Sequence, residues 1–104
     1  GKTSPEDLLA AAHASCYAMA FSHALATGGH KPERVSVTST VGFGPKAGGG
    51  GFEVKYSHLD VTGKVPGMDQ AAFEQAAKEG EAGCPISNAL RNNIDIELNA
   101  KLEQ

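Results

Sequence analysis

Residues 8–26 contain no Lys, Arg, Asp or Glu, and alanine and larger apolar side chains fill most of these positions. Just before them, Ser4 suits a helix N-cap and Pro5 suits the first helical position, and acidic residues follow in the first turn. A Thr-Gly-Gly sequence ends the apolar stretch. The pattern predicts a helix over residues 5–26 that is apolar nearly all round, which is typical of a helix buried in a core.

Period-two alternation of apolar and polar residues predicts three strands. They are residues 35–43, 52–65 and 94–102. The glycine-rich segment 44–51 predicts a hairpin loop between the first two. In the second strand the apolar positions change parity, which predicts a bulge near Ser57 and His58. His58 is therefore expected to be a bulge or surface residue.

Two shorter helices are predicted between the second and third strands. Asp69 suits the N-cap of the first, and Gly80 and Gly83 are expected to loosen and then end it. The second begins at Cys84, with Pro85 at its first helical position, and ends near residue 92. This order of elements predicts a single α+β domain over residues 1–104, with the long helix packed against an antiparallel sheet.

Charge and composition limit the classes of partner. The net charge is −3 and no basic run is present, so a nucleic-acid partner is not expected. The apolar helix is long enough to span a membrane, but its alanines and its histidine and serine interruptions favour a packed helix of a soluble protein. A chain of 104 residues has little surface with which to cover so long a helix, and we therefore expect a homodimer.

Two cysteines carry the candidate chemistry. Without a wider pattern of paired cysteines, they favour a reducing, cytoplasmic compartment and a functional thiol pair, and two inert buried cysteines are the alternative. Cys84 begins a helix, which favours a thiolate, whereas Cys16 lies mid-helix among alanines, which does not unless a cation is near. On this physical argument Cys84 is the more acidic thiol.

Other side chains of the long helix are candidates to act on Cys16. His13 lies one turn before it and His23 two turns after it on nearly the same face, so either could polarise the thiol. Alternatively, both histidines pack or hydrogen-bond in a dimer core. His13 and Cys16 could also ligate a metal with Cys84 or another histidine, although the spacing typical of a structural zinc site is missing. Glu6 could orient a cation near the thiol or simply complement the helix dipole.

Three segments resemble the osmotically inducible protein C and organic hydroperoxide resistance (OsmC/Ohr) family: TSPEDLLAAAHASCYAMAFS, VTGKVPGMD and AGCPISNALRNNIDIELNAKL. The resemblance covers residues 2–102. Its specific motifs are a Pro-Glu pair, in which Glu6 lies ten residues before Cys16, and a Gly-Cys-Pro-apolar-Ser sequence around Cys84, 68 positions after Cys16. The AAHASC sequence, which includes His13, resembles the OsmC branch more than the Ohr branch.

The resemblance implies a thiol peroxidase of oxidative-stress defence that needs no metal or other cofactor. The residue matching Cys16 is the family's peroxidatic cysteine, which reduces a hydroperoxide to an alcohol and becomes a sulfenic acid. The residue matching Cys84 is the resolving cysteine, which forms an intramolecular disulfide that an external dithiol, such as a lipoyl protein, reduces. This assignment reverses the physical ranking of the two thiols. The family fold is an intertwined α+β homodimer with its active sites at the subunit interface.

In the family an arginine pairs with the peroxidatic thiolate, and a glutamate, matched here by Glu6, holds that arginine. The arginine belongs to an N-terminal segment, and neither Arg34 nor Arg91 is at the matching position. We therefore expect the chain to be a piece of a longer protein, whose further segment supplies the arginine and additional strands. The alternative is a protein without the activating cation.

Two functions remain open from the sequence. The first is reduction of organic hydroperoxides, which an apolar pocket around Cys16 would favour over hydrogen peroxide because it binds the alkyl group. The apolar neighbours are Tyr17, Met19, Ala20 and Phe21. The second function is that of a non-catalytic OsmC-like dimer that binds an apolar or lipid-like ligand at its interface. Peroxide-dependent formation of a disulfide between Cys16 and Cys84 distinguishes the two.

Overall fold

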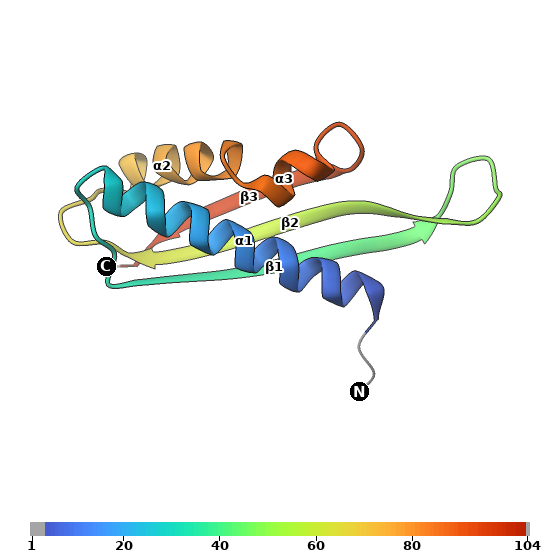
Figure 1. Cartoon of the computed structure of the whole chain (residues 1–104), viewed down its shortest axis with the longest axis horizontal. Coiled ribbons are helices and arrows are strands. Elements are labelled where there is room, and N and C mark those ends of the chain that lie inside the picture. Colours follow the sequence, from blue (N-terminus) through green and yellow to red (C-terminus); the bar gives the residue numbers. More distant parts are fainter. Residues whose placement is uncertain (1–3, 104) are drawn as a thin grey trace.

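The order of elements agrees with the prediction. The computed structural model describes residues 4–103, and the chain runs helix, strand, strand, helix, helix, strand (Figure 1). The bounds are α1 Pro5–Thr27, β1 Arg34–Pro45, β2 Phe52–Lys64, α2 Gln70–Ala82, α3 Pro85–Leu90 and β3 Asp95–Leu102.

The two longer helices begin at the N-caps that the sequence indicates. The Ser4 hydroxyl accepts a hydrogen bond from the Asp7 amide at 3.3 Å, and Gly28 follows the last residue of α1 as its C-cap. At the start of α2, the Asp69 carboxylate accepts from the Ala72 amide at 2.8 Å. These bonds satisfy amide groups that the first turn of a helix leaves without a backbone partner.

The strands form one mixed sheet in the order β1–β2–β3. β1 and β2 pair antiparallel as a hairpin, as predicted, but β3 pairs parallel to β2. The prediction of an antiparallel sheet is therefore wrong for the last strand. The reason is the connection, because α2 and α3 carry the chain back along the sheet before β3 begins, and a helical crossover allows a parallel return.

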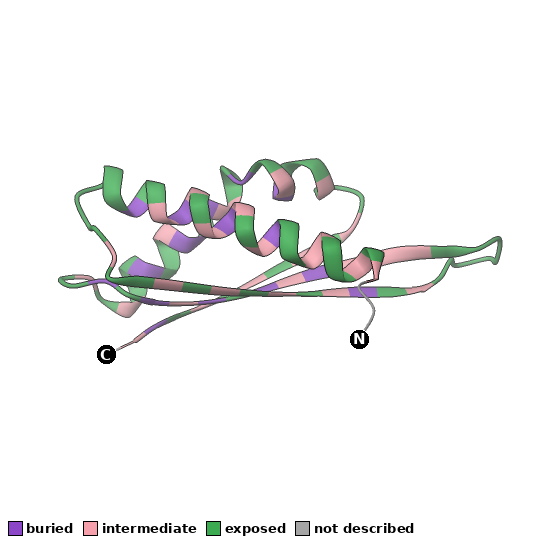
Figure 2. Cartoon of the chain, turned by 60° about the horizontal axis from the view of Figure 1, so that its bottom comes forward, coloured by how far each residue is buried: buried purple, intermediate pink, exposed green. Residues whose placement is uncertain are grey.

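All of the helices in the described chain lie on one face of the sheet, with α1 beside α2 (Figures 1 and 2). The buried residues of α1, spaced four apart, are His13, Tyr17, Phe21 and Leu25. On the opposite side of α1, Leu8 is 61% and Met19 is 73% exposed. The prediction that α1 is buried nearly all round is wrong for the single chain, because the sheet and α2 cover only one side of the helix.

By length and mean hydropathy alone, α1 is long enough and apolar enough to cross a membrane. In the fold its buried stripe faces other parts of the protein, and His13 and Tyr17 of that stripe hydrogen-bond to residues on other elements. These contacts are typical of a helix that packs within a folded domain.

The bulge in β2 lies at Lys55, shortly before the predicted position. The register of β1 against β2 shifts between Gly42 and Phe43, so Lys55 has no partner on β1. After this bulge, Ser57 lies fully buried on the face that carries the helices. His58 lies on the other face in regular pairing, as a partly exposed surface residue.

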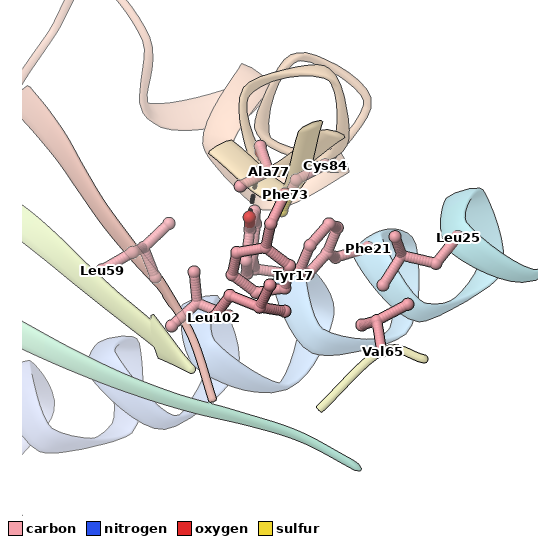
Figure 3. Packing of buried hydrophobic residues seen from close by; sticks show 10 residues of the cluster. Tyr17, Phe21, Leu25, Leu59, Val65, Phe73, Ala77, Cys84 and Leu102 are labelled. Atoms are coloured by element: carbon pink, nitrogen blue, oxygen red, sulfur yellow. Dashed lines mark hydrogen bonds between the residues drawn. The ribbon is translucent and has the colours of Figure 1, made fainter. Parts of the chain in front are cut away.

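Aromatic side chains of α1 and α2 fill the core. Phe21 and Phe73, both fully buried, meet edge to face with their ring centroids 5.3 Å apart (Figure 3). Gly80 allows α2 to approach this cluster, since a Cβ at that position would lie 3.2 Å from the Phe21 Cα. Gly80 therefore permits close packing of two helices and, contrary to the prediction, lies inside a continuous helix α2.

Candidate active site

The two thiols lie on elements that pack against each other. Cys16 is half-buried near the middle of α1, and Cys84 is fully buried as the N-cap of α3. The Cys16 side chain packs against the core cluster that includes Cys84, and Cys84 is near enough to raise the pKa of Cys16. Figure 3 shows Cys84 at the edge of the aromatic cluster. The fold thus brings together two cysteines that are 68 positions apart.

The first turn of α3 presents successive amide groups to the thiols. The Ser87 amide donates to Cys84 Sγ at 3.5 Å, and the Ile86 amide is near enough to Cys16 to lower its pKa. Amide donors stabilise a sulfur that carries negative charge. The stabilisation of negative charge on either sulfur therefore depends on the position of the first turn of α3.

Burial raises the pKa of Cys16 above its ordinary value. The Ile86 amide lowers this pKa in part, whereas a hydrogen bond with Cys84 and the charge of a Cys84 thiolate raise it further. The prediction that Cys16 is a weak acid without a nearby cation is confirmed for this chain. Because the thiolate is the reactive form, Cys16 is poorly activated by the described residues alone.

His13 is fully buried one turn before Cys16, and both of its ring nitrogens are hydrogen-bonded. Nδ1 lies 2.6 Å from Ser57 Oγ on β2, and Nε2 lies 2.6 Å from Ser87 Oγ on α3. Ser57 Oγ in turn lies 3.0 Å from Ser39 Oγ on β1. The expected hydrogen bonding of His13 in a core is therefore found within one chain.

These bonds take up the ring nitrogens that a metal ligand would need, so the alternative of a metal site on His13 and Cys16 has no support. Within residues 4–103, His, Cys, Asp and Glu side chains form no cluster that could hold a metal ion. His23 is exposed in the single chain and takes no part in this network, so its expected place in a dimer core stays a prediction.

The stability of the fold should depend on pH through His13. Burial lowers the pKa of His13, while the charge of Glu81 raises it and that of Arg91 lowers it by smaller amounts. The unfolded chain therefore takes up this proton at a higher pH than the folded chain. The contribution of His13 to the unfolding free energy is therefore greatest above about pH 6.5, and it decreases as the pH falls toward the lowered pKa.

Urea unfolding from about pH 8 down to about pH 5 should show this loss in the wild type and a flatter profile in His13→Gln. A His13→Gln profile as steep as that of the wild type would contradict the role assigned to the buried imidazole.

Tyr17 serves the core and is not available as an acid or base. Burial, with smaller effects of the Glu81 and Cys84 charges, raises the pKa of Tyr17, and its hydroxyl donates to the Ala77 carbonyl at 2.9 Å. Tyr17 and Phe21 are fully buried, and Met19 is exposed on the other side of α1. The expectation that these side chains line an apolar pocket at Cys16 is therefore wrong within this chain.

Glu6 lies apart from the thiols. It is in the first turn of α1, and ten residues of helix place it about 15 Å from Cys16 along the helix axis. Each of the two arginines of residues 4–103 forms an ion pair with a glutamate, Arg34 at 2.7 Å and Arg91 at 3.0 Å. Neither arginine is among the groups that shift the pKa of Cys16.

The model of a protein family described as OsmC-like protein matches residues 1–99. The chain belongs to the OsmC family. Peroxiredoxin OsmC of Escherichia coli (strain K12) is 33% identical over 99 residues, which are 95% of this chain and 68% of that protein. The organic hydroperoxide resistance protein of Xanthomonas axonopodis pv. citri (strain 306) is 40% identical over 97 residues, which are 92% of this chain and 65% of that protein.

Solved structures of OsmC-family proteins share the fold. An organic hydroperoxide resistance protein from Elizabethkingia anophelis superposes with a TM-score of 0.85 at 28% identity, over 97% of this chain and 69% of that one. An organic hydroperoxide resistance protein OsmC from Legionella pneumophila gives a TM-score of 0.85 at 32% identity, over 97% of this chain and 71% of that one. The chain thus spans about two thirds of the length of its OsmC-family relatives.

The sequence argument does not identify the two serines that hydrogen-bond to His13. Ser57 shares the parity of Leu59 and Val61, which are buried, and a polar residue on a buried face requires a hydrogen-bond partner. Parity is therefore the signal that could have identified Ser57. Ser87 is part of the Gly-Cys-Pro-apolar-Ser motif, although the motif alone does not indicate that His13 is its partner.

Proposed function

We propose that the protein is a thiol peroxidase that reduces organic hydroperoxides in oxidative-stress defence, with Cys16 as the peroxidatic and Cys84 as the resolving cysteine. The observation that carries the proposal is the packing of Cys16 against the core cluster that contains Cys84, where α1 meets α3, in a member of the OsmC family. The names of relatives, peroxiredoxin OsmC and organic hydroperoxide resistance protein, support the same class of reaction.

In the first step of this cycle, the Cys16 thiolate attacks the terminal oxygen of the hydroperoxide. The O–O bond breaks, the alkoxide leaves and takes up a proton to become an alcohol, and Cys16 becomes a sulfenic acid. In the second step, the Cys84 sulfur attacks Cys16, the S–O bond breaks, and the hydroxyl leaves with the Cys84 proton as water.

An external dithiol, such as a lipoyl protein, then reduces the disulfide by two successive exchanges and is itself oxidised to a disulfide. The cycle uses no metal or other cofactor. It requires a compartment in which thiols are kept reduced, and the proposal accordingly places the protein in the cytoplasm.

The raised pKa of Cys16 supports a further part of the proposal, which concerns Glu6. A cation beside the sulfur would lower this pKa and increase the fraction of thiolate. In the proposal, a guanidinium from outside the described residues supplies the cation. Because Glu6 lies about 15 Å along α1 from Cys16 of its own chain, it would orient that guanidinium from the second subunit of a dimer.

Intact-mass measurement after addition of cumene hydroperoxide to the fully reduced protein tests the proposal. We expect the mass to fall by that of two hydrogens, which is the signature of a disulfide, and dihydrolipoamide to restore it. Hydrogen peroxide at the same concentration is the matched comparison, and a slower reaction with it would support organic hydroperoxides as the substrate class. A protein that stays reduced, while it binds an apolar fluorescent probe as a dimer, would overturn the proposal in favour of the non-catalytic OsmC-like dimer.

A homodimer is part of the same proposal, and the uncovered side of α1 supports it. Leu8 and Met19 are exposed there, and near the β1–β2 turn the stacked rings of Phe43 and Phe52 are 54% and 65% exposed. Exposed large apolar side chains of this kind are typical of an interaction surface. A second subunit on this surface would also limit the access of water to Cys16.

Met19→Lys should weaken the proposed dimer, because it places a charge at the centre of the apolar side of α1. The dimer dissociation constant is expected to rise by about 30-fold, which corresponds to about 2 kcal/mol at an interface hot spot. Sedimentation equilibrium measures it. Gln75→Lys introduces the same side chain on the exposed side of α2 and should leave the constant unchanged. A wild type that is monomeric at micromolar concentration would refute the dimer.

A further inference from the structure

One imidazole joins three elements of the fold. His13 on α1 bonds Ser57 on β2 and Ser87 on α3, each at 2.6 Å, and all of these side chains are fully buried. A buried polar group is costly unless its partners are in place, so a fully bonded network of this kind resists movement. The start of α3 is therefore fixed relative to the helix that carries Cys16.

The bond to Ser87 is the polar link between α1 and α3. The other side-chain bonds at α3 come from Asn88 and Arg91, and they run to residues 81–82 of α2 or between these two residues. Within residues 4–103, the bond from His13 to Ser87 is the one side-chain to side-chain hydrogen bond that joins α1 to α3. Without it, apolar packing would be the main contact between this short helix and α1.

Ser87 lies in the turn of α3 that is next to both sulfurs. Its own amide donates to Cys84 at 3.5 Å, and the preceding amide, that of Ile86, is near Cys16. We infer that His13 is a positioning residue for the second step of the cycle: by holding Ser87, it fixes the position of Cys84 relative to Cys16. This inference rests on the proposed function, and it gives His13 a role that needs no contact with the peroxide.

The geometric demand of the second step makes this role important. A disulfide forms only within a narrow range of separation and dihedral angle, so the two sulfurs must be held close and correctly oriented. A misplacement of about 1 Å in reacting groups can slow a reaction by about 100-fold. A small shift of α3 would therefore slow disulfide formation more than it would affect attack on a small, diffusing peroxide.

Ser87→Ala and Ser57→Ala form a matched pair that separates positioning from stability. Each variant removes one fully buried hydroxyl and leaves one ring nitrogen of His13 without its partner, so both should destabilise the fold. Ser57→Ala also removes the hydrogen bond to Ser39, so it should destabilise the fold more than Ser87→Ala does. Only Ser87→Ala releases the start of α3.

The rate of the second step is measured on peroxide-treated protein by trapping the Cys16 sulfenic acid with dimedone and counting disulfide by mass spectrometry. We expect Ser87→Ala to slow disulfide formation by about 10-fold to 100-fold, with a much smaller effect on sulfenic acid formation. Ser57→Ala should stay within about twofold of the wild type in both steps, even though it is less stable.

A thiol–disulfide equilibrium tests the same role without peroxide. Glutathione disulfide oxidises Cys16 and Cys84 to a disulfide and is reduced to two molecules of glutathione, and the equilibrium constant reports how well the two thiols are positioned. Ser87→Ala should lower this constant about 10-fold, and Ser57→Ala should not. Equal losses in the two variants, or no loss in Ser87→Ala, would overturn the positioning role.

The two assays also distinguish failure of this inference from failure of the proposed function. If the wild type does not react with peroxide, but Ser87→Ala alone lowers the equilibrium constant with glutathione, the peroxidase is refuted and His13 is retained as a positioning residue. If the wild type reacts with peroxide, but the two serine variants lower the glutathione equilibrium constant equally, the peroxidase is retained and the positioning role of His13 is refuted.

Substitutions of His13 itself provide a rescue test. The amide of His13→Gln reaches the place of Nε2 and can keep the bond to Ser87, whereas that of His13→Asn reaches the place of Nδ1 and can keep the bond to Ser57. We expect the glutamine variant to retain the wild-type glutathione equilibrium and the asparagine variant to behave as Ser87→Ala does. The opposite order would overturn the inference.

Discussion

Cys16→Ser is expected to abolish consumption of organic hydroperoxide, which is the largest functional effect of any substitution considered. A serine hydroxyl is a far weaker nucleophile than a thiolate and can form neither a sulfenic acid nor a disulfide. The measurement is the loss of cumene hydroperoxide with dihydrolipoamide as reductant. The fold should survive, because the change replaces one atom at a half-buried site.

Cys84→Ser is the matched control for the order of the two thiols. It should react once with peroxide and then stop, with oxygen added to Cys16, because no resolving thiol remains. Since burial raises the pKa of Cys16, the first step should become faster as the pH rises from neutral into the alkaline range. If Cys84→Ser stays unoxidised and Cys16→Ser gains oxygen, the roles are reversed and the argument from the helix start is the correct one.

Phe21→Ala is expected to lower the unfolding free energy by about 3–5 kcal/mol, the largest loss of stability predicted for this chain. Phe21 is fully buried, and its ring packs against two others. The centroid of the Phe21 ring lies 5.6 Å from that of Tyr17 and 5.3 Å from that of Phe73. The close approach of α2 at Gly80 leaves little freedom for the helices to close the cavity. The total unfolding free energy of a small domain is only about 5–15 kcal/mol, so the variant should be partly unfolded at moderate temperature.

Urea denaturation at one fixed protein concentration measures this loss. Phe43→Ala is the control, because it deletes the same ring at a position that is 54% exposed and should cost about 1 kcal/mol or less. A loss from Phe43→Ala as large as that from Phe21→Ala would mean that the core described here is not the main source of stability.

Local signals in the sequence account for most elements of the fold. Ser4 and Asp69 identify the starts of α1 and α2 because capping depends on residues three positions away. The direction of β3 has no local signal, since its parallel pairing follows from the path of the two helices before it. The extent of burial of α1 likewise depends on what lies around it and not on its own residues.

The candidate site divides in the same way. Cys16 and Cys84 are identified by their motifs, and the packing of Cys16 against the cluster that contains Cys84 agrees with the roles proposed for them. The partners of His13 lie 44 and 74 positions away, on a strand and a short helix, so only the folded chain identifies them. The position of the bulge decides which face Ser57 occupies, and the sequence places that bulge too late in the strand.

The placement of the two thiols along the chain has a consequence for the stability of the whole domain. Cys16 precedes every strand of the described chain, and Cys84 follows β1, β2 and α2, so a disulfide between them closes a loop of 68 residues. Closing a loop of this length restricts the unfolded chain and stabilises the native state by about 4 kcal/mol in the chain-entropy model. Each turn of the proposed cycle would therefore alternate between a protease-sensitive reduced form and a more resistant oxidised form. In the proposed cycle, the reduced form that reacts with peroxide would be the less stable of the two, and the reductant would act on the more stable oxidised form.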